Sequence, residues 1–431
     1  MSELVGTRSA ETRERIQRLE GSGTRTFVEP DPIVWEETAG SRVRDADGAW
    51  YLDLYAGFAA ATVGYCHPRV TDAICRQAAR MTHCPSAYPS STRAELYERL
   101  VAIAPPGLER VLPAVTGALA NETAIQLAKA ATGRTTVISF AGAYLGRSLG
   151  VVGYAGKHAY QRRLGARPDA QFLPYPDPYR SPWADGRDPG AAALALLEEL
   201  LGDPAAGVGP PACVVVEPVQ GNGGAVVPPD GFLAGLRRLC DASGTLLVFD
   251  EVQCGFGRTG RMWACDHECV VPDLMTVGKG IGGGLPFAAV LGRDDVMTTW
   301  VPDTITSTFL TNALVAAAAC AAIDVVRDER LVERSATLGE RAFARLRDEL
   351  RDRPHVGEVR GRGLFLGIEL VRDGAEPDAE LTADVIRALR ERGVIVGRGG
   401  RFGNVLKLSP PLVIGDEELD DGLSAIVEVL T

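Results

Sequence analysis

Short apolar runs alternate with amphipathic stretches through the middle of the chain. Four runs rich in apolar residues, at 135–140, 212–219, 245–252 and 287–292, have the sequences TTVISF, ACVVVEPV, TLLVFDEV and FAAVLG. Runs of this length are typical of strands buried within a parallel or mixed sheet. The segment 231–244 has apolar residues at helical spacing and closes on a glycine, which predicts a helix. This alternation predicts an α/β fold whose mainly parallel central sheet is flanked by helices.

The two ends of the chain follow a different pattern. Residues up to about 20 predict a charged helix or arm, and apolar and polar residues alternate on both sides of Asp47-Gly48, a hairpin signal. After about Asp324, a long charged helix, a pair of strands and a helix continuing into a strand are expected. We expect the N-terminal hairpin to pack with this α+β segment. The predicted domains are an arm and hairpin at 1–60, a large domain at 61–324, and the rest of a small domain at 325–431.

The composition indicates which classes of binding partner and which cellular compartment to expect. The 431 residues are 46% hydrophobic and 23% charged, as expected for a globular protein with a sizeable core. A net charge of −11 makes nucleic acids and anionic membranes poor partners. Nine scattered cysteines argue against a disulfide framework and for a reducing cytoplasm. No signal peptide is expected at the charged start, and no apolar run reaches the ~20 residues of a membrane span. The alanine-rich run after Asn312 predicts a buried helix.

The strongest candidate for chemistry lies between Leu246 and Pro286. A buried strand ends at Asp250, an amide follows at Gln253, and a second short strand ends at Lys279 between two glycines. These residue types suit pyridoxal 5′-phosphate (PLP). A carboxylate can keep the pyridine nitrogen protonated, and a lysine can bond to the cofactor aldehyde and later carry a proton. The glycines would let the backbone approach a flat ring. Taken singly, Asp250 could be a turn residue and Lys279 a solvated loop residue.

The same stretch resembles the signature of class III aminotransferases. The pattern DEVQxGFGRTG…PDxxTxGKGxGGGxP is long and occurs here in order. The resemblance implies PLP fold type I, with catalytic Lys279 and Asp250 and with Gln253 donating to the cofactor's phenolic oxygen. It also implies transfer of an amino group between an amine donor and a carbonyl acceptor. A decarboxylase, epimerase or racemase on the same scaffold is one alternative, and a non-catalytic PLP-fold binding protein is another.

A phosphate site is expected where a helical pattern begins at Thr116-Gly117-Ala118. The first turn of a helix presents free N–H groups and the positive end of the helix dipole to an anion. The segment resembles the family's [ST]-G-[STA]-x-A-N-E loop, although Leu119 replaces a common acid. An ordinary helix cap is the alternative.

Two further residues are expected beside the cofactor. Tyr144 follows the strand at 135–140 and resembles the family's aromatic that lies against the pyridine ring, although Leu145 replaces the usual histidine. A core aromatic is the alternative for Tyr144. Glu217, in the family-like sequence EPVQG, comes at a strand end, where open α/β sheets bind ligands.

The segment ITSTFLTNA resembles an element that supplies a threonine to the phosphate site of the neighbouring subunit. That role corresponds to Thr308, so the resemblance implies a homodimer with shared active sites. A helix cap is the alternative for Thr308.

Two positions depart from the family pattern where substrate is expected. Lys407 stands where relatives that use amino acids often carry an arginine, and Asn222 stands where a glutamate can pair with that arginine. Lysine is a point charge and cannot reproduce the planar fork of arginine. We therefore hypothesise that the acceptor is not a simple α-keto acid but a carbonyl on a larger molecule, such as an amino sugar or polyamine. Alternatively, Lys407 is solvated and another arginine binds carboxylate.

The cysteine–histidine cluster at Cys265, His267 and Cys269 does not predict a metal site. Its spacing lacks a second pair of ligands, so no metal is expected.

Overall fold

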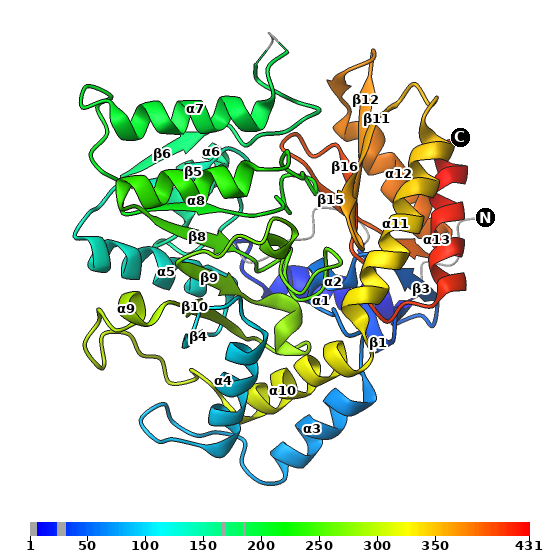
Figure 1. The fold of residues 1–431 in the computed structure, drawn as a ribbon. Helices are drawn as coiled ribbons and strands as arrows, with labels where there is room; N and C mark the ends of the chain where they lie inside the picture. Colours follow the sequence, from blue (N-terminus) through cyan, green and yellow to red (C-terminus); the bar gives the residue numbers. More distant parts are fainter. Residues whose placement is uncertain (1–6, 24–31, 166–168, 184–185) are drawn as a thin grey trace.

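The computed structural model describes residues 7–23, 32–165, 169–183 and 186–431. A seven-stranded sheet occupies the middle of the molecule, in the order β4-β10-β9-β8-β7-β5-β6 (Figure 1). Its strands are β4 (Arg110–Ala114), β5 (Val137–Phe140), β6 (Ala170–Leu173), β7 (Cys213–Val216), β8 (Leu246–Asp250), β9 (Leu274–Val277) and β10 (Ala288–Gly292). All neighbours from β9 to β6 pair in parallel, and β10 is antiparallel to both of its neighbours. The predicted mainly parallel α/β sheet is confirmed.

Each of the four predicted central strands is present. Successive side chains of a strand point to opposite faces of the sheet, and both faces are covered, so these strands are apolar at nearly every position. On one face, Val214 and Phe249 belong to the same apolar cluster as Phe232 and Leu236 of α8 (Phe232–Ser243). On the other face, Val215 and Val248 cluster with residues of α5 (Gly117–Thr132). The predicted helix at 231–244 ends where expected, with Gly244 left-handed at φ 62°.

The remaining helices of this part lie around the sheet (Figure 1). They are α3 (Pro68–Ala78), α4 (Ser91–Ile103), α6 (His158–Leu164), α7 (Pro189–Gly202), α9 (Asp294–Met297) and α10 (Ala313–Asp328), with the short 3-10 helices η1 (Val152–Tyr154), η2 (Ala264–His267) and η3 (Lys279–Gly282). The predicted buried helix after Asn312 is α10, whose apolar residues join the main core.

The C-terminal segment forms a second sheet beside the first one (Figure 1). The elements of this C-terminal segment are α11 (Leu331–Leu350), β11 (Val356–Arg362), β12 (Phe365–Arg372), β13 (Glu376–Pro377), α12 (Ala379–Glu391), β14 (Val394–Ile395), β15 (Gly397–Gly399), β16 (Val405–Leu408) and α13 (Asp416–Val429). The predicted charged helix, strand pair and helix leading into a strand correspond to α11, to β11 and β12, and to α12 with β14.

The N-terminal hairpin joins the C-terminal segment through backbone pairing. The described N-terminal elements are α1 (Thr7–Leu19), β1 (Trp35–Ala39), β2 (Arg42–Asp45), β3 (Trp50–Asp53) and the short turn α2 (Ala56–Ala59). Strand β3 pairs in parallel with β14, and a four-stranded sheet β1-β2-β3-β14 results. Behind it, Leu52 and Leu54 lie against Gly422 of α13. The hairpin therefore packs with the C-terminal segment as expected, while the domain limits at 60 and 324 stay a prediction.

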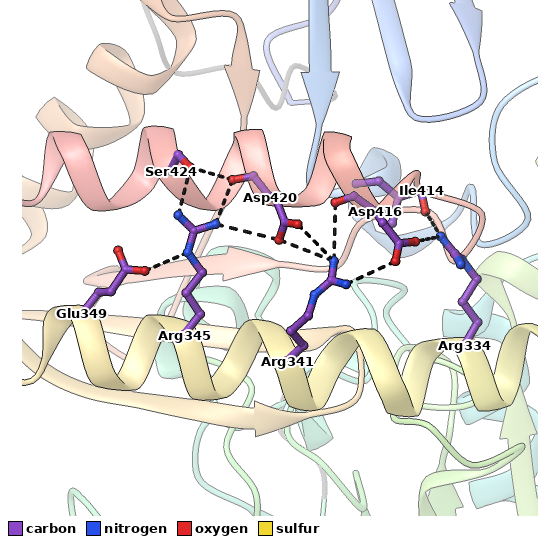
Figure 2. Close-up of polar contacts among 8 residues, drawn as sticks. All are labelled: Arg334, Arg341, Arg345, Glu349, Ile414, Asp416, Asp420 and Ser424. Carbon is purple, nitrogen blue, oxygen red and sulfur yellow. Dashed lines mark hydrogen bonds and ion pairs between the residues drawn. The ribbon is translucent and has the colours of Figure 1, made fainter.

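Helices α11 and α13 are joined by a row of ion pairs along their solvent side (Figure 2). Arg334 and Arg341 of α11 both reach Asp416, at 2.7 and 3.2 Å, and Arg341 also reaches Asp420 at 3.4 Å. Because these side chains are partly exposed, each pair contributes at most about 1 kcal/mol. The apolar residues beneath them, which include Leu338 and Leu423, hold the two helices together.

One surface prediction needs correction. The Pro-, Gly- and Asp-rich composition of segment 175–190 predicts a loop on or near the surface, and residues 184–185 lie outside the described residues. The beginning of this segment is buried instead, because the Tyr175 hydroxyl donates to the backbone oxygen of Glu217 at 3.0 Å. Among the described residues, no helix has the length and apolarity to cross a membrane.

Candidate functional site

The sequence-predicted acid and lysine lie at one edge of the central sheet. Strands β7, β8 and β9 run in parallel, so Glu217, Asp250 and Lys279 all follow or end strands at the same, carboxyl edge. Glu217 and Asp250 are buried and Lys279 is half-buried, and the charge of the lysine acts on the ionisation of both carboxyl groups. Ligands bind at this edge in open α/β sheets.

A network of hydrogen bonds holds the Asp250 carboxylate. Its Oδ1 accepts from the Val252 amide at 3.0 Å, and its Oδ2 accepts from Asn121 Nδ2 at 2.7 Å. The Thr276 hydroxyl lies 2.7 Å from Asn121 Oδ1 and 3.3 Å from Asp250 Oδ1. Burial raises the pKa of Asp250, and the hydrogen bonds and the charge of Lys279 oppose that rise. The network therefore fixes the position of a carboxylate beneath the site.

Lys279 is the first residue of η3 and has a left-handed backbone, with φ 49°. Burial lowers the pKa of its amine, and the charges of Asp250 and Glu217 counteract that effect. A Cβ at Gly280 would lie 2.0 Å from Thr62 Oγ1. Glycine at this position therefore makes room for a neighbouring side chain of the protein, whereas the sequence had suggested room for a ligand ring.

Glu217 connects the sheet edge to the loop that carries Tyr144. Its two carboxylate oxygens accept from the amides of Tyr144 at 3.1 Å and Gly221 at 3.0 Å. Burial, and next the charge of Asp250, raise the pKa of Glu217 to about 7. Tyr144 is half-buried, and the Arg147 guanidinium lies 5.8 Å from the centre of its ring. Tyr144 is thus an aromatic at the edge of a site rather than a fully buried core residue.

The predicted anion site and helix cap coincide at the start of α5. The Thr116 hydroxyl accepts from the Leu119 amide at 3.2 Å, which makes Thr116 the cap. The amides of Gly117 and Ala118 belong to the first turn, where N–H groups have no acceptor within the helix. A Cβ at Gly117 would lie 2.8 Å from Val252, so the start of α5 lies close to the residues that follow Asp250.

Gln253 lies against the EPVQG turn. A Cβ at Gly221 would lie 2.3 Å from its side-chain oxygen Oε1, so only glycine leaves room for the amide there. This places the Gln253 amide beside the turn whose Gly221 amide donates to Glu217.

Lys407 comes from the C-terminal segment, in the centre of β16. Its side chain is 1% exposed and lies between two aromatic rings, with Nζ 5.5 Å from the centre of the Tyr55 ring and 5.9 Å from that of Phe365. Burial, with the charges of Lys279 and Lys157, lowers its pKa to about 7, against the effect of Glu217. The alternative that Lys407 is solvated is therefore wrong. No ion pair joins it to a carboxylate of the described chain.

Asn222 lies close to Lys407 through the β15–β16 turn. Its backbone oxygen accepts from the Gly400 amide at 3.1 Å, and a Cβ at Gly399 would meet the Lys407 side chain. Asn222 Nδ2 is buried and has no hydrogen-bond partner in the described part of the protein.

Thr308 lies apart from these residues. It is exposed on the loop before α10, and Asn312 caps that helix by accepting from the Leu314 amide at 2.9 Å. Thr308 is therefore not the helix cap.

Sequence reasoning missed several residues of the site. Asn121 and Thr276 stand in the quoted family motifs without a predicted role, and Lys157 stands in neither motif. Thr276 pairs with Asp250 across β8 and β9, so the strand register is what reveals its contact with the carboxylate. Lys157 has no local signal, because a loop brings it to the site from another part of the chain.

The residues fit the phosphate, ring nitrogen and aldehyde of PLP. The first-turn amides of α5 suit a phosphate, the buried carboxylate of Asp250 suits a protonated ring nitrogen, and the amine of half-buried Lys279 suits an aldehyde. Within the part of the chain that the structure describes, no group of three or more His, Cys, Asp or Glu side chains is arranged to hold a metal ion. All nine cysteines are free.

Comparisons with known proteins agree with this chemistry. The family model described as Aminotransferase class-III matches residues 26–430. A diaminobutyrate–2-oxoglutarate aminotransferase of Rhizobium meliloti (strain 1021) is 37% identical over 96% of this chain and 91% of the relative. An alanine/serine racemase of Pyrococcus horikoshii is 34% identical over 98% of this chain and 90% of the relative. The crystal structure of ornithine aminotransferase from Toxoplasma gondii ME49 superposes with a TM-score of 0.86 at 32% identity, covering 98% of this chain and 94% of that one.

The Asp250 network yields a stability prediction. Asn121→Ala removes a donor from a buried carboxylate, and we expect the unliganded protein to lose about 1–3 kcal/mol of unfolding free energy. Asn121→Asp places a second carboxylate at hydrogen-bond distance and should cost more at pH 8. That extra loss should shrink toward pH 5, because repulsion makes one of the two carboxyls take up a proton. Urea unfolding at both pH values measures the effect; equal stability of the two variants at pH 8 would contradict the network.

Proposed function

Because the chain belongs to the class-III aminotransferase family and is a PLP-dependent transaminase, we propose that Lys279 holds the cofactor and carries the transferred proton. The observation that supports this most is the placement of Lys279 and Asp250. Asp250 is buried and Lys279 half-buried at the ends of neighbouring strands, and each influences the ionisation of the other. A lysine and a carboxylate so arranged can face opposite ends of one small heterocycle.

The other predicted residues would hold the remaining parts of the cofactor. The amides of Gly117 and Ala118, with Thr116 beside them, would bind the phosphate. Tyr144 would lie against the ring, and Gln253 would donate to the phenolic oxygen. Glu217 would position the cofactor site indirectly, because its carboxylate accepts hydrogen bonds from the Tyr144 and Gly221 amides and holds both loops in place. When bound, PLP supplies an electron-withdrawing ring that stabilises negative charge at the substrate carbon.

Lys279 and Asp250 would then have distinct roles. Burial lowers the pKa of the lysine amine, so a larger fraction is neutral and able to accept a proton from the substrate carbon. Asp250, oriented by Asn121, would accept a charge-assisted hydrogen bond from the ring nitrogen and favour its protonated form. Proton transfer by a positioned side chain typically contributes about 10²–10⁴-fold to a rate.

A homodimer with shared sites is the second part of the proposal. Thr308 is exposed, and so are three large apolar side chains on its own loop and on the loop that contains Thr82: Phe309 is 61% exposed, Val301 73% and Tyr88 66%. The loops that carry them are joined, since Asn312 Nδ2 donates to the Thr82 backbone oxygen at 2.9 Å. Exposed apolar side chains on two joined loops support a protein–protein contact. A second copy of the chain would cover them and bring Thr308 to its phosphate site.

The substrate is the least constrained part of the proposal. The amino-sugar or polyamine acceptor inferred from the sequence had its support in the missing arginine at 407 and missing glutamate at 222. The charge around Lys407 does not favour a cationic group at that point, because Lys157 and Lys279 are also nearby. Named relatives act on diaminobutyrate and ornithine, which supports including amino acids among the donors.

The racemase relative supports a second candidate activity for the same site. Racemisation needs removal and return of a proton at one carbon but no second carbonyl substrate. Lys279 could act on one face of the substrate carbon in either reaction, so only the products distinguish them.

The cofactor assignment predicts two different defects. Lys279→Ala should lose both the yellow absorbance of lysine-linked cofactor and turnover, because the bond-forming amine and the proton carrier are the same group. Asp250→Asn should fold and retain cofactor but react far more slowly, because a neutral amide cannot stabilise the charged ring nitrogen. Absorbance spectra, and mass spectrometry after borohydride reduction, measure the first effect. A turning-over Lys279→Ala protein, or reduced cofactor on another lysine, would overturn the assignment.

The shared-site proposal predicts complementation between defective subunits. Thr308→Val should weaken cofactor binding, and a differently tagged Lys279→Ala subunit should be inactive. In a hybrid of the two, the remaining Lys279 receives its threonine from the partner, so that site should bind cofactor as tightly as the wild type. A hybrid as weak as the Thr308→Val homodimer would show that Thr308 acts within its own subunit, and a monomer by light scattering would exclude sharing.

Transamination and racemisation predict different products from a single turnover. With diaminobutyrate, ornithine, 4-aminobutyrate, a polyamine or an aminoglycoside as donor and no acceptor, a transaminase should release about one carbonyl product per site and stop. Adding an oxo acid as amino acceptor should restart release of the carbonyl product. Inversion of alanine or serine without carbonyl release would favour the racemase, and reaction with aminoglycosides alone would favour the amino-sugar interpretation.

A further inference from the structure

The short turn α2 is a left-handed helical turn. Its four residues have backbone φ angles between 47° and 66°. The Ala59 amide donates to the Tyr55 backbone oxygen at 2.9 Å, so the turn is hydrogen-bonded as a helix. This backbone is unfavourable for residues that carry a Cβ, and of the four only Gly57 has none. A strained element of this kind persists only where the surrounding structure holds it.

The carboxylate of Asp53 holds α2. Its Oδ1 accepts from the Tyr55 amide at 2.7 Å, and its Oδ2 accepts from the Gly57 amide at 3.1 Å and from the Tyr65 hydroxyl at 2.6 Å. Amides at the start of a helical turn have no acceptor within it, and this carboxylate serves two of them. Asp53 is 0% exposed, so water cannot replace these bonds. Asp53 therefore offsets part of the strain in α2.

The residues on either side of α2 lie against two different parts of the candidate site. Before the turn, the centre of the Tyr55 ring lies 5.5 Å from Lys407 Nζ. After the turn, Thr62 lies against Gly280, which follows Lys279 in the chain. The conformation of α2 therefore sets the spacing between these two contacts.

Backbone hydrogen bonds anchor both ends of the segment that contains α2. Before the turn, the Leu54 amide donates to the Ile395 oxygen at 2.9 Å. After it, the Thr62 oxygen accepts from the Leu412 amide at 2.8 Å. Loss of the Asp53 bonds should therefore shift α2 between two fixed ends rather than unfold the segment.

We propose that Asp53 is a positioning residue for the reaction of the proposed function. By holding α2 in its left-handed form, Asp53 keeps Tyr55 against Lys407 on the substrate side. The same turn keeps Thr62 beside the loop that carries Lys279, on the cofactor side. The inference rests on the proposed function, because cofactor and substrate would meet between these two contacts.

Balancing the charge of Arg258 is the alternative role for Asp53. Arg258 is buried, and its Nη2 donates to Thr62 Oγ1 at 3.4 Å. Burial lowers the pKa of Arg258 to about 9, and the charge of Asp53 opposes that fall. The two roles can be separated, because relief of backbone strain can replace a positioning bond but cannot replace a charge.

Hydrogen–deuterium exchange of the PLP-loaded protein, followed by mass spectrometry, measures the effect on α2. Asp53→Asn leaves one acceptor oxygen and turns a donor toward the second amide, so residues 54–61 should exchange several-fold faster than in the wild type. Asp45→Asn is the matched control. Asp45 accepts from two amides and from the Tyr51 hydroxyl in the neighbouring β2–β3 hairpin, so its loss should leave exchange in 54–61 unchanged.

Aminooxyacetate measures the effect on the reacting site without turnover. Its nitrogen bonds to the cofactor aldehyde carbon as the lysine nitrogen leaves, and the yellow absorbance is lost. Asp53→Asn should retain cofactor that borohydride fixes to Lys279, but it should need more than about tenfold more aminooxyacetate for half-saturation, because small misplacements at a reacting site are costly. Asp45→Asn should react like the wild type.

A rescue variant separates positioning from charge. Ala59→Gly removes the Cβ at a position with φ 63°, so its addition to Asp53→Asn should restore most of the slow exchange and of the aminooxyacetate half-saturation. A complete lack of rescue would favour charge balance with Arg258 and overturn the inference. Wild-type behaviour of Asp53→Asn, or equal defects in Asp45→Asn, would also overturn it.

Tyr65→Phe tests the inference if Asp53→Asn does not fold. It keeps the carboxylate and removes one of its bonds, so it should show the same two changes to a smaller degree. Wild-type exchange and half-saturation in Tyr65→Phe would then overturn the inference. Failure of the proposed function looks different, because the wild-type protein itself would carry no borohydride-reducible cofactor on Lys279.

Discussion

The site depends on a carboxylate kept in a position where water cannot solvate it. Asp250 lies at the end of a strand buried on both faces, and desolvation of a carboxylate there is expensive. The Asn121 amide, the Val252 backbone and the Thr276 hydroxyl offset part of that cost by bonding it directly. A nearby positive charge would offset more of the desolvation cost of Asp250. The half-buried lysine at position 279 provides one positive charge, and a protonated heterocycle between the two would provide another.

The site is built from the seven-stranded sheet and from the sheet of the C-terminal segment. The large sheet supplies the acid, the lysine and the amides at the start of α5. The C-terminal segment supplies Lys407 on β16, which pairs with β12 and β15. Arg258, which is fully buried, joins the two parts by donating to the backbone oxygens of Leu364 and Pro410. The position of the substrate side relative to the cofactor side therefore depends on the packing of these two parts.

Membership in the family settles the class of reaction but not the substrate, and the physical reason lies in where the substrate residues come from. The residues proposed for the cofactor lie in or beside a few continuous motifs. Lys407 and Asn222 come from separate segments that meet at one glycine turn. Charge balance at such a meeting point depends on every segment that reaches it, and a change in one residue can be compensated by another far away in the chain.

Much of the fold was readable from the sequence because it is encoded locally. Apolar runs buried on both faces predicted the strands, Gly244 marked the end of α8, and Asp47-Gly48 marked a hairpin. Asp250, Gln253 and Lys279 could be identified because their spacing along one strand–turn–strand unit is itself a signal. The burial of Tyr175, the packing reason for Gly280, and the partnership of Asn121 and Thr276 with Asp250 could not be read in this way. They depend on contacts between residues far apart in the chain, and only the folded arrangement of the two sheets decides which distant side chains share a space closed to water.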